Sequence, residues 1–196
     1  MNLDYHKDAK LAPEARDCRH IFAYGSLIWN PGFAFVERSI AKLAGFHRSL
    51  CVYSNHYRGT PEKPGLVLGL DTGGSCRGVV YRVADQEWHA VLAYVRKREL
   101  ISDVYREAVR DVSIASTGAR VSSLTYVVDK QHSQYAGKLD VDDIAKFVAQ
   151  GHGVSGASRD YVEKTLMALK DMGLEEKKLQ SVLDKSDQQL NAPIKP

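Results

Sequence analysis

The sequence predicts an α+β protein whose centre is a small closed or partly closed mixed β-barrel, with one helix inserted among the strands and C-terminal helices packed on it. Before residue 130, roughly six or seven strand-type segments rich in β-branched and aromatic residues alternate with turn residues, and one helical pattern interrupts them. From residue 140 onward, apolar residues recur at helical spacing. A single helix among many strands favours a barrel over a repeated strand–helix–strand architecture.

Each expected strand ends at a turn signal. Gly45 forms a hinge between two strands, and the run from Asp71 to Gly74 is typical of a β-hairpin turn, because its two glycines tolerate positive φ. The run Ser116-Thr117-Gly118-Ala119 joins the last two strands. The first strand begins at residue 20, and the others are expected over residues 35–44, 46–54, 66–70, 78–83, 105–115 and 120–128.

Residues 85–99 are expected to form the inserted helix. Apolar residues from Trp88 to Val95 recur at i, i+3, i+4 and i+7, which places them on one helix face. Asp85 precedes this pattern, and aspartate is a preferred N-cap residue. We therefore expect a helix that begins at Asp85 and packs one apolar stripe against the barrel.

Three further helices are expected after residue 140. Asp140 is a suitable N-cap for the first, and Gly151 and Gly173 end the first and second. Their apolar faces comprise Ile144, Phe147 and Val148, then Val162, Leu166, Leu169 and Met172, then Leu179, Val182, Leu183 and Leu190. We expect a flexible N-terminal arm over residues 1–19, a single domain over 20–190 and a frayed tail over 191–196.

Composition narrows the classes of function. The 196 residues carry 27 basic and 24 acidic side chains, a net charge of +3, which is too weak to indicate nucleic-acid binding. No apolar run approaches the length of about 20 residues that a membrane helix needs, and no secretory signal is visible. We therefore expect no nucleic-acid partner and no membrane association. The oligomeric state stays open, with a monomer favoured.

The cysteines and histidines predict neither a disulfide framework nor a metal site. The three cysteines are Cys18, Cys51 and Cys76, an odd number without a C-x-x-C spacing. The seven histidines show no metal-ligand spacing. These features favour a reducing cytoplasmic location, no metal and no cofactor.

The stretch HIFAYGSLIWNPGF, from His20 to Phe33, holds the first candidate site. Its strand is broken at Gly25 and Ser26 before an apolar run resumes at Leu27. The backbone N–H groups of these three residues have no obvious partner in a ladder or helix, and convergent N–H groups form a binding place for an anion. The alternative is an ordinary tight turn between a strand and a packed segment.

Glu99 is the second candidate site. It lies eleven positions after Trp88, about 20° around the helix, and so continues the apolar stripe. Burial and the negative end of the helix dipole are both expected to raise the pKa of its carboxyl group, whereas Arg96 or Arg98 offsets part of this effect if either folds back. The alternatives are a solvated helix end or a structural ion pair with an arginine.

Three segments together resemble the ChaC-type γ-glutamylcyclotransferases. They are Tyr24–Phe33 (YGSLIWNPGF), Tyr57–Gly65 (YRGTPEKPG) and Tyr94–Glu99 (YVRKRE), in the order that the family shows. The resemblance covers roughly residues 20–185 and implies the barrel fold of that family. It assigns the catalytic glutamate to Glu99.

The resemblance also implies the substrate-binding residues. It places substrate on the end of the first strand and the turn that follows, at Ile21, Phe22, Ala23, Tyr24, Gly25, Ser26 and Leu27. Arg58 either reaches a substrate carboxylate or braces its own loop. The family commonly follows its glutamate with a short Gly-Tyr turn, whereas here residues 100–104 intervene before Tyr105, so the role of Tyr105 as a wall of the site stays open.

The reaction that the resemblance implies needs no cofactor. The α-amine of a γ-glutamyl peptide attacks the γ-carbonyl, 5-oxoproline forms, and the peptide amine leaves. For the ChaC branch the expected substrate is glutathione and the second product is Cys-Gly. The alternatives are another γ-glutamyl amine or dipeptide as substrate, or a non-catalytic binding or regulatory protein on the same fold.

Overall fold

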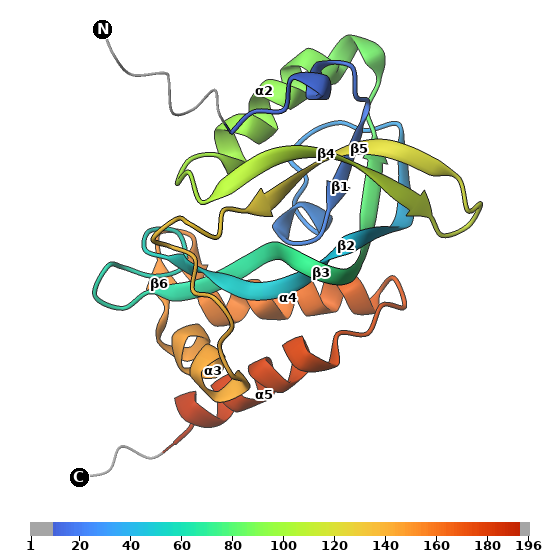
Figure 1. Cartoon of the computed structure of the whole chain (residues 1–196). Coiled ribbons are helices and arrows are strands. Elements are labelled where there is room, and N and C mark those ends of the chain that lie inside the picture. Colours follow the sequence, from blue (N-terminus) through green and yellow to red (C-terminus); the bar gives the residue numbers. More distant parts are fainter. Residues whose placement is uncertain (1–9, 193–196) are drawn as a thin grey trace, which may run out of the picture. The chain divides into compact units, whose positions relative to one another are not determined.

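Five strands close into a mixed barrel, which confirms the predicted fold class (Figure 1). The computed structural model describes residues 10–192. β1 pairs in parallel with β5, where Ile21 lies opposite Leu124, and antiparallel with β3, where His20 lies opposite Arg82. The strand order is β1-β3-β2-β4-β5. The strands span His20–Ala23 (β1), Glu37–Ser54 (β2), Gly65–Arg82 (β3), Tyr105–Ile114 (β4) and Arg120–Val128 (β5).

The chain divides into two compact units. The first contains the residues up to Ser49 together with Gly69–Ser133, and the second contains Leu50–Leu68 together with the chain from Gln134 onward. β2 and β3 each pass from one unit into the other along the chain. β1, β4 and β5 belong wholly to the first unit, as do both candidate sites on the YGSL segment and at Glu99.

The hairpin predicted across residues 71–74 is wrong, because β3 continues through them as one strand. Gly73 and Gly74 adopt φ values of +96° and +69°, which bend the strand without reversing it. The Gly73 carbonyl lies 3.1 Å from His47 Nδ1 on β2. Gly45 likewise has a φ of +83° inside β2, so the expected hinge lies within a single continuous strand. Glycine marks both turns and strand irregularities, and local sequence does not distinguish them.

The inserted helix begins three residues later than predicted. A short 3₁₀ turn, η3 (Asp85–Glu87), precedes α2 (Trp88–Glu99). Asp85 makes no cap hydrogen bond and instead pairs with Arg19, whose Nε lies 3.0 Å from Asp85 Oδ1. The N-cap prediction for Asp85 is therefore wrong. The apolar face of α2 is buried as expected, and Trp88 is fully buried.

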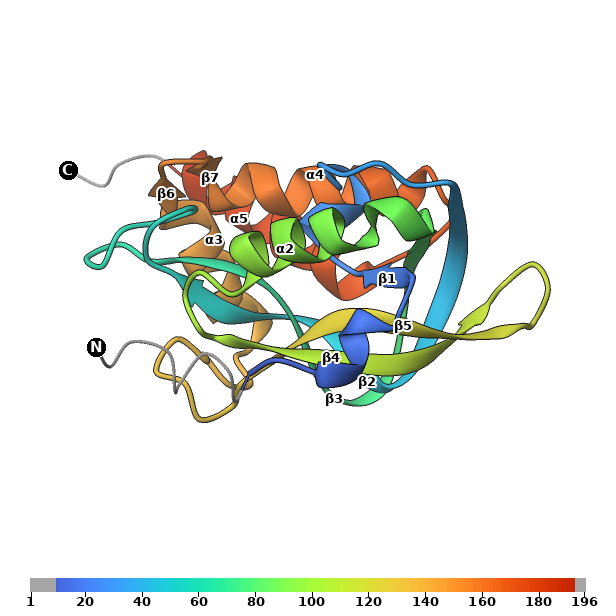
Figure 2. The same cartoon turned by 90° about the horizontal axis from the view of Figure 1, so that it is seen from above.

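The N-terminal segment from residue 10 belongs to the first unit and is packed on other elements of that unit. Figure 2 shows its 3₁₀ turn η1 (Pro13–Arg16) beside β4. The same turn contacts α2, where the carbonyl of Ala15 accepts a 2.9 Å hydrogen bond from Trp88 Nε1. The flexibility of the arm expected over residues 1–19 stays a prediction. The first nine residues of that arm lie outside the described residues, as do the last four residues of the expected tail.

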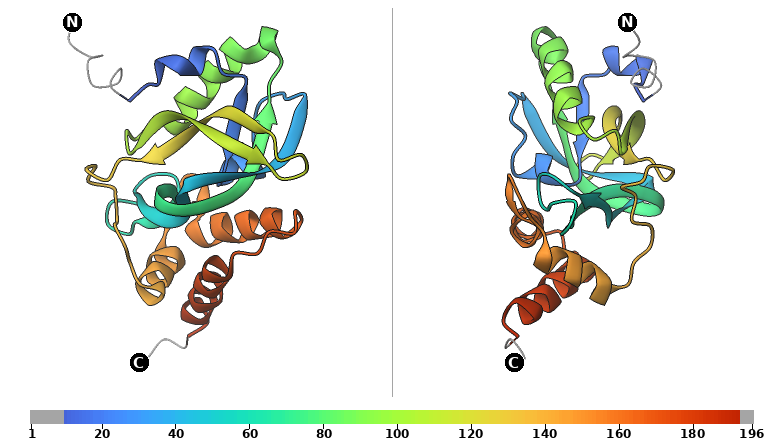
Figure 3. Two further views of the ribbon diagram at one scale, coloured as in Figure 1. Left: turned by 45° about the vertical axis from the view of Figure 1, so that its right-hand side comes forward. Right: turned by 90° about the vertical axis from the view of Figure 1, so that its left-hand side faces the viewer.

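The second unit contains three helices after the barrel strands (Figure 3). Asp140 caps the first as predicted, because its Oδ1 accepts a 2.8 Å bond from the backbone N–H of Asp143. Ser158 Oγ donates to the carbonyl of Leu66 at 2.7 Å and so joins α4 to β3. No described helix combines the length and the apolarity that crossing a membrane demands. The elements are α3 (Val141–Gln150), β6 (His152–Gly153), β7 (Gly156–Ala157), α4 (Ser158–Lys170) and α5 (Lys177–Leu190).

Candidate active site

The YGSL segment forms a buried turn directly after β1. The 3₁₀ turn η2 (Ser26–Ile28) follows Gly25, and the carbonyls of Leu27 and Ile28 accept the hydroxyl of Tyr81 at 3.0 and 3.1 Å. Among the residues that the structure describes, the N–H groups of Gly25, Ser26 and Leu27 donate no hydrogen bond. The turn therefore leaves three backbone donors available to a ligand oxygen.

Residues from three other strands fix the start of this segment. Arg48 Nε on β2 donates to the carbonyl of Tyr24 at 2.6 Å, and Thr125 Oγ1 on β5 donates to the carbonyl of Phe22 at 3.1 Å. On β3, a Cβ at Gly78 would lie 2.3 Å from the carbonyl oxygen of Ala23, so only glycine permits this close approach. Ile21, Phe22 and Ala23 are themselves buried, so their side chains belong to the core and any substrate contact from them is made by backbone.

Arg98 connects the YGSL turn to Glu99. Its Nη2 donates to Ser26 Oγ at 2.9 Å, and its Nη1 donates to the carbonyl of Asn30 at 2.6 Å. Its Nε lies 3.2 Å from Glu99 Oε1. One guanidinium group thus holds the carboxylate at the end of α2 beside the turn that follows β1. The two candidate sites of the sequence, which are more than seventy residues apart, are brought together in this way.

Glu99 is mostly buried, with 17% of its side chain exposed. Burial raises the pKa of its carboxyl group above the ordinary value, and the positive charge of Arg98 opposes part of that rise. A carboxylate with a raised pKa is a stronger base than a solvated one, and its protonated form can donate to a leaving group near neutral pH. The ion pair with Arg98 is the structural alternative raised by the sequence, and here it coexists with burial.

Tyr105 begins β4 and is buried, with Val128 of β5 opposite it in the strand register. In the segment before it, Asp103 adopts a left-handed φ of 56°, a conformation that aspartate tolerates better than most residues. The role of Tyr105 as a wall of the site stays a prediction. Glu107 lies two residues further along β4, on the same buried face.

The sequence did not single out Glu107 or Tyr126, and it raised Arg96 only as a possible neighbour of Glu99. Arg96 Nη2 lies 2.6 Å from Glu107 Oε1, and the hydroxyl of Tyr126 lies 3.4 Å from Glu107 Oε2. The available signal was the strand alternation, which places Glu107 on the same face as Tyr105. Nothing in the sequence indicated that Arg96 would reach it, because that contact depends on how α2 packs on β4.

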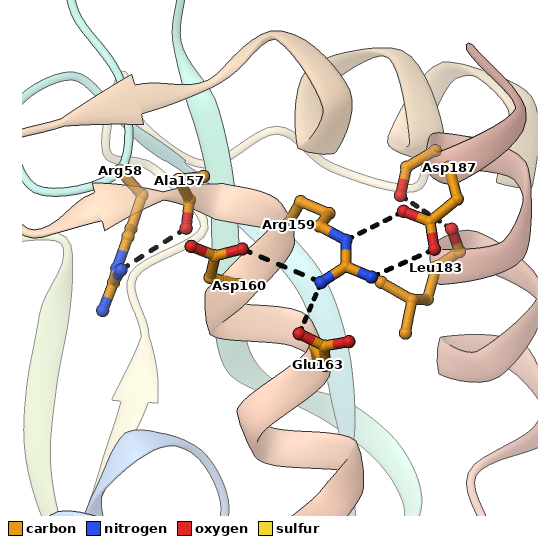
Figure 4. A network of polar contacts seen from close by, with 8 residues as sticks. Arg58, Ala157, Arg159, Asp160, Glu163, Leu183 and Asp187 are labelled. Carbon is orange, nitrogen blue, oxygen red and sulfur yellow. Dashed lines mark hydrogen bonds and ion pairs between the residues drawn. The ribbon is translucent and has the colours of Figure 1, made fainter. Parts of the chain in front are cut away.

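Arg58 lies in the second unit and contacts backbone there (Figure 4). Its Nη1 donates to the carbonyls of Ser155 and Ala157, the latter at 3.4 Å, and its guanidinium lies 5.6 Å from the ring centroid of Tyr161. Burial lowers the pKa of Arg58 from its ordinary value. These contacts correspond to the loop-bracing role that the sequence left open for Arg58.

No group of three or more His, Cys, Asp or Glu side chains in the described part of the chain is arranged to hold a metal ion. The candidate active site consists of three parts. They are the carboxylate of Glu99 with its raised pKa, Arg98, which links that carboxylate to the YGSL turn, and the backbone N–H donors of that turn. Together they can take up and return a proton beside a bound anionic or carbonyl oxygen.

Comparison with known proteins gives consistent relatives. A family model described as ChaC-like protein matches residues 19–189. The glutathione-specific γ-glutamylcyclotransferase of Escherichia coli (strain K12) is 31% identical over 163 residues, which cover 83% of this chain and 70% of the relative. The γ-glutamylcyclotransferase 2-3 of Arabidopsis thaliana is 33% identical over 165 residues, with 80% and 82% covered. Among solved structures, a yeast γ-glutamylcyclotransferase specific to glutathione shares the fold, with a TM-score of 0.77, 23% identity and coverage of 86% of this chain and 95% of that one.

Proposed function

Because the chain belongs to the ChaC-like protein family, we propose that it is a γ-glutamylcyclotransferase that converts glutathione to 5-oxoproline and Cys-Gly. The observation that carries the proposal within this structure is the mostly buried carboxylate of Glu99, held by Arg98 beside the YGSL turn. We propose Glu99 as the acid–base group of this reaction.

The reaction needs a base rather than a covalent nucleophile. Attack by the α-amine of the substrate on its own γ-carbonyl is intramolecular, and such reactions reach effective molarities of about 10⁵ to 10⁸ M when well oriented. The α-amine is however an ammonium at neutral pH. With reference pKa values of about 8 for the amine and 4.3 for glutamate, proton transfer is uphill by roughly 5 kcal/mol.

The raised pKa of Glu99 lowers this barrier. Each unit by which a carboxyl pKa lies above its reference value reduces the cost of deprotonating the amine by about 1.4 kcal/mol. Protonated Glu99 then gives its proton to the departing amine of Cys-Gly, so the proton is returned within one turnover. Ionised and neutral forms of the same group therefore serve successive steps.

The YGSL turn supplies donors for the substrate oxygens in this proposal. The N–H groups of Gly25, Ser26 and Leu27 are oriented by the surrounding fold before substrate arrives, which makes them effective partners for the oxyanion that develops at the γ-carbonyl or for the α-carboxylate. Tyr24 and Tyr105 are proposed as neighbours of the substrate, and Arg58 is assigned the bracing role that its contacts support.

The proposed location is the cytoplasm. The three cysteines, which all lie in the described part of the chain, are buried and form no disulfide, which suits a reducing compartment. Glutathione in its thiol form is abundant only where reducing conditions hold, so substrate and compartment agree.

Product analysis tests the proposal. Purified protein is incubated with reduced glutathione, and 5-oxoproline and Cys-Gly are quantified by chromatography for wild type, Glu99→Gln and Glu87→Gln. We expect both products in equal amounts from wild type and from the Glu87→Gln control, since Glu87 is an exposed residue before α2, and none from Glu99→Gln. Full turnover by Glu99→Gln would exclude Glu99 as the base.

The two alternatives give different results in the same assay. Inactivity with glutathione together with release of 5-oxoproline from γ-glutamyl dipeptides or amines would retain the reaction and change the substrate. Inactivity with all of these compounds, combined with measurable binding of glutathione, would indicate a non-catalytic binding protein on this fold.

A further inference from the structure

A second carboxylate, on the strand that follows α2 in the chain, is not used by the proposed mechanism. The side chain of Glu107, on β4, is completely buried. Arg96 holds it with two parallel contacts, from Nε to Oε2 at 2.8 Å and from Nη2 to Oε1 at 2.6 Å. This two-point geometry is the strongest arrangement between arginine and a carboxylate, and it joins the last turn of α2 to β4.

The N-terminal segment and β5 complete the surroundings of Glu107. The backbone N–H of Ala12 donates to Glu107 Oε1 at 3.1 Å, and the hydroxyl of Tyr126 lies 3.4 Å from Oε2. The backbone N–H of Glu107 itself donates to the carbonyl of Lys10 at 2.8 Å. Arg96, Ala12 and Tyr126 therefore each offer a donor to the carboxylate oxygens of Glu107.

Two observations connect the Arg96–Glu107 pair with Glu99. Arg96 lies three residues before Glu99, so the two side chains leave the same face of α2. Tyr126 contacts Glu107 and also interacts electrostatically with Glu99. Burial and the negative charges of Glu107 and Glu99 raise the pKa of Tyr126 well above its ordinary value, so its phenol stays protonated.

Arg98 of α2 is the charged group in contact with Glu99, and the charge of Glu99 acts on Tyr126 of β5. Arg96, which is paired with Glu107 of β4, lies one helical turn before Glu99 on α2. Arg98 contacts Glu99 directly and already opposes the rise of its pKa. A second uncompensated arginine one helical turn away would add to that effect and weaken the base. Glu107 neutralises the charge of Arg96, so that Arg96 does not lower the pKa of Glu99 further.

We propose that Arg96 and Glu107 form a positioning pair for Glu99, in which the two-point contact fixes the last turn of α2 against β4 and the mutual neutralisation preserves the basicity of Glu99. This inference rests on the proposed function of Glu99 as the acid–base group. Neither residue needs to touch the substrate. The pair acts through the place and the charge environment of the carboxylate that does.

The two single variants should shift the pH profile in opposite directions. Glu107→Gln keeps the shape of the side chain but leaves the charge of Arg96 uncompensated, which stabilises ionised Glu99. The acid limb of kcat/KM for glutathione should then move to lower pH by about one unit, and kcat on the plateau should fall because the base is weaker. Arg96→Gln leaves Glu107 without its cation, and the acid limb should move to higher pH.

The double variant Arg96→Gln/Glu107→Gln decides between a charge effect and simple loss of structure. It contains neither charge, so its acid limb should return to within about 0.3 pH unit of wild type even though both contacts are weakened. Arg96→Lys keeps the charge without the two-point geometry. It should leave the limb in place and lower kcat alone.

A control variant in the second unit distinguishes an effect on the stability of the protein from an effect on the basicity of Glu99. Arg159 holds Asp187 with a comparable two-point contact, at 2.8 and 3.1 Å, and joins α4 to α5 (Figure 4). Arg159→Gln should lower the melting temperature without moving the acid limb. If Glu107→Gln does not fold, Arg96→Gln carries the test, because its expected shift has the opposite sign.

The outcomes distinguish this inference from the proposed function. Wild type that forms no 5-oxoproline would overturn the proposed function and the inference with it. Active wild type whose single variants lose activity with unmoved acid limbs would retain the function and overturn the inference, since a purely structural ion pair predicts that pattern. Opposite shifts that cancel in the double variant would establish the positioning pair.

Discussion

Glu99 combines two opposing influences on its protonation. Removal of the carboxylate from water favours the neutral form, while Arg98 at 3.2 Å favours the ionised form, and burial is the larger effect. An acid–base group benefits from this balance because a pKa above the ordinary value makes the carboxylate a stronger base. The arginine does not simply neutralise the carboxylate. Its other nitrogens bind Ser26 and Asn30, so its charge is shared with the turn.

The raised pKa of Glu99 predicts how Glu99→Gln affects stability. A carboxyl group whose folded pKa exceeds its unfolded pKa contributes most to stability below the unfolded value, and that contribution is lost as pH rises through the folded value. Wild type is therefore expected to be less stable at pH 7 than a variant with a neutral side chain at this position. We expect Glu99→Gln to have an equal or higher melting temperature than wild type at pH 7, and no such advantage near pH 4.

Calorimetry of the two proteins at pH 7 and pH 4 provides the measurement. Glu87→Gln is the matched control, because an exposed carboxylate should change stability little at either pH. A melting temperature several degrees lower in Glu99→Gln at pH 7 would show that the ion pair with Arg98 dominates, and it would contradict the account of Glu99 as a destabilising buried base.

At the level of single elements, the sequence predicted what local pattern determines and missed what depends on packing. The cap at Asp140 and the apolar face of α2 follow from spacing along the chain, and both are present. Asp85 has the residue type of a cap, but Arg19 from another segment binds it instead. The buried Glu107 could not be paired with Arg96 in advance, because the pair forms only once α2 lies on β4.

The turn η2 depends on one tyrosine from β3. Tyr81 is fully buried and donates its hydroxyl to the carbonyls of Leu27 and Ile28, the residues that follow the candidate donors. Tyr81→Phe keeps the ring and removes this bond, which leaves buried carbonyls unsatisfied at a cost of about 1–3 kcal/mol. We expect kcat/KM for glutathione to fall about tenfold, since a displaced turn misplaces its N–H groups.

Tyr161→Phe is the control for this change. The hydroxyl of Tyr161 accepts a 3.3 Å bond from the backbone N–H of Leu68, so its removal should destabilise the protein by a comparable amount. Melting curves and steady-state kinetics on both variants give the comparison. Equal losses of kcat/KM in the two variants would mean that general destabilisation, and not the position of η2, lowers the activity of Tyr81→Phe.

On the scale of the whole molecule, two strands link the compact units. β2 enters the second unit at Leu50, and β3 leaves it after Leu68, so each unit contains part of the same two strands. The sequence predicted one domain over residues 20–190, and the continuity of these strands gives a physical reason to expect the two units to unfold together.

The N-cap of α3 offers a test of this cooperativity. Asp140→Ala removes the bond to the N–H of Asp143 and should cost about 1 kcal/mol, which lowers the melting temperature by about 2–4 °C in a protein of this size. If the shared strands couple the units, loss of helical circular dichroism and loss of glutathione turnover should shift together. Asp140→Asn retains a capping oxygen and should restore most of the loss. If instead the helical signal of Asp140→Ala declines at a lower temperature than its activity, the second unit unfolds on its own, because only α3–α5 would then have lost structure while Glu99 and the YGSL turn in the first unit remained in place.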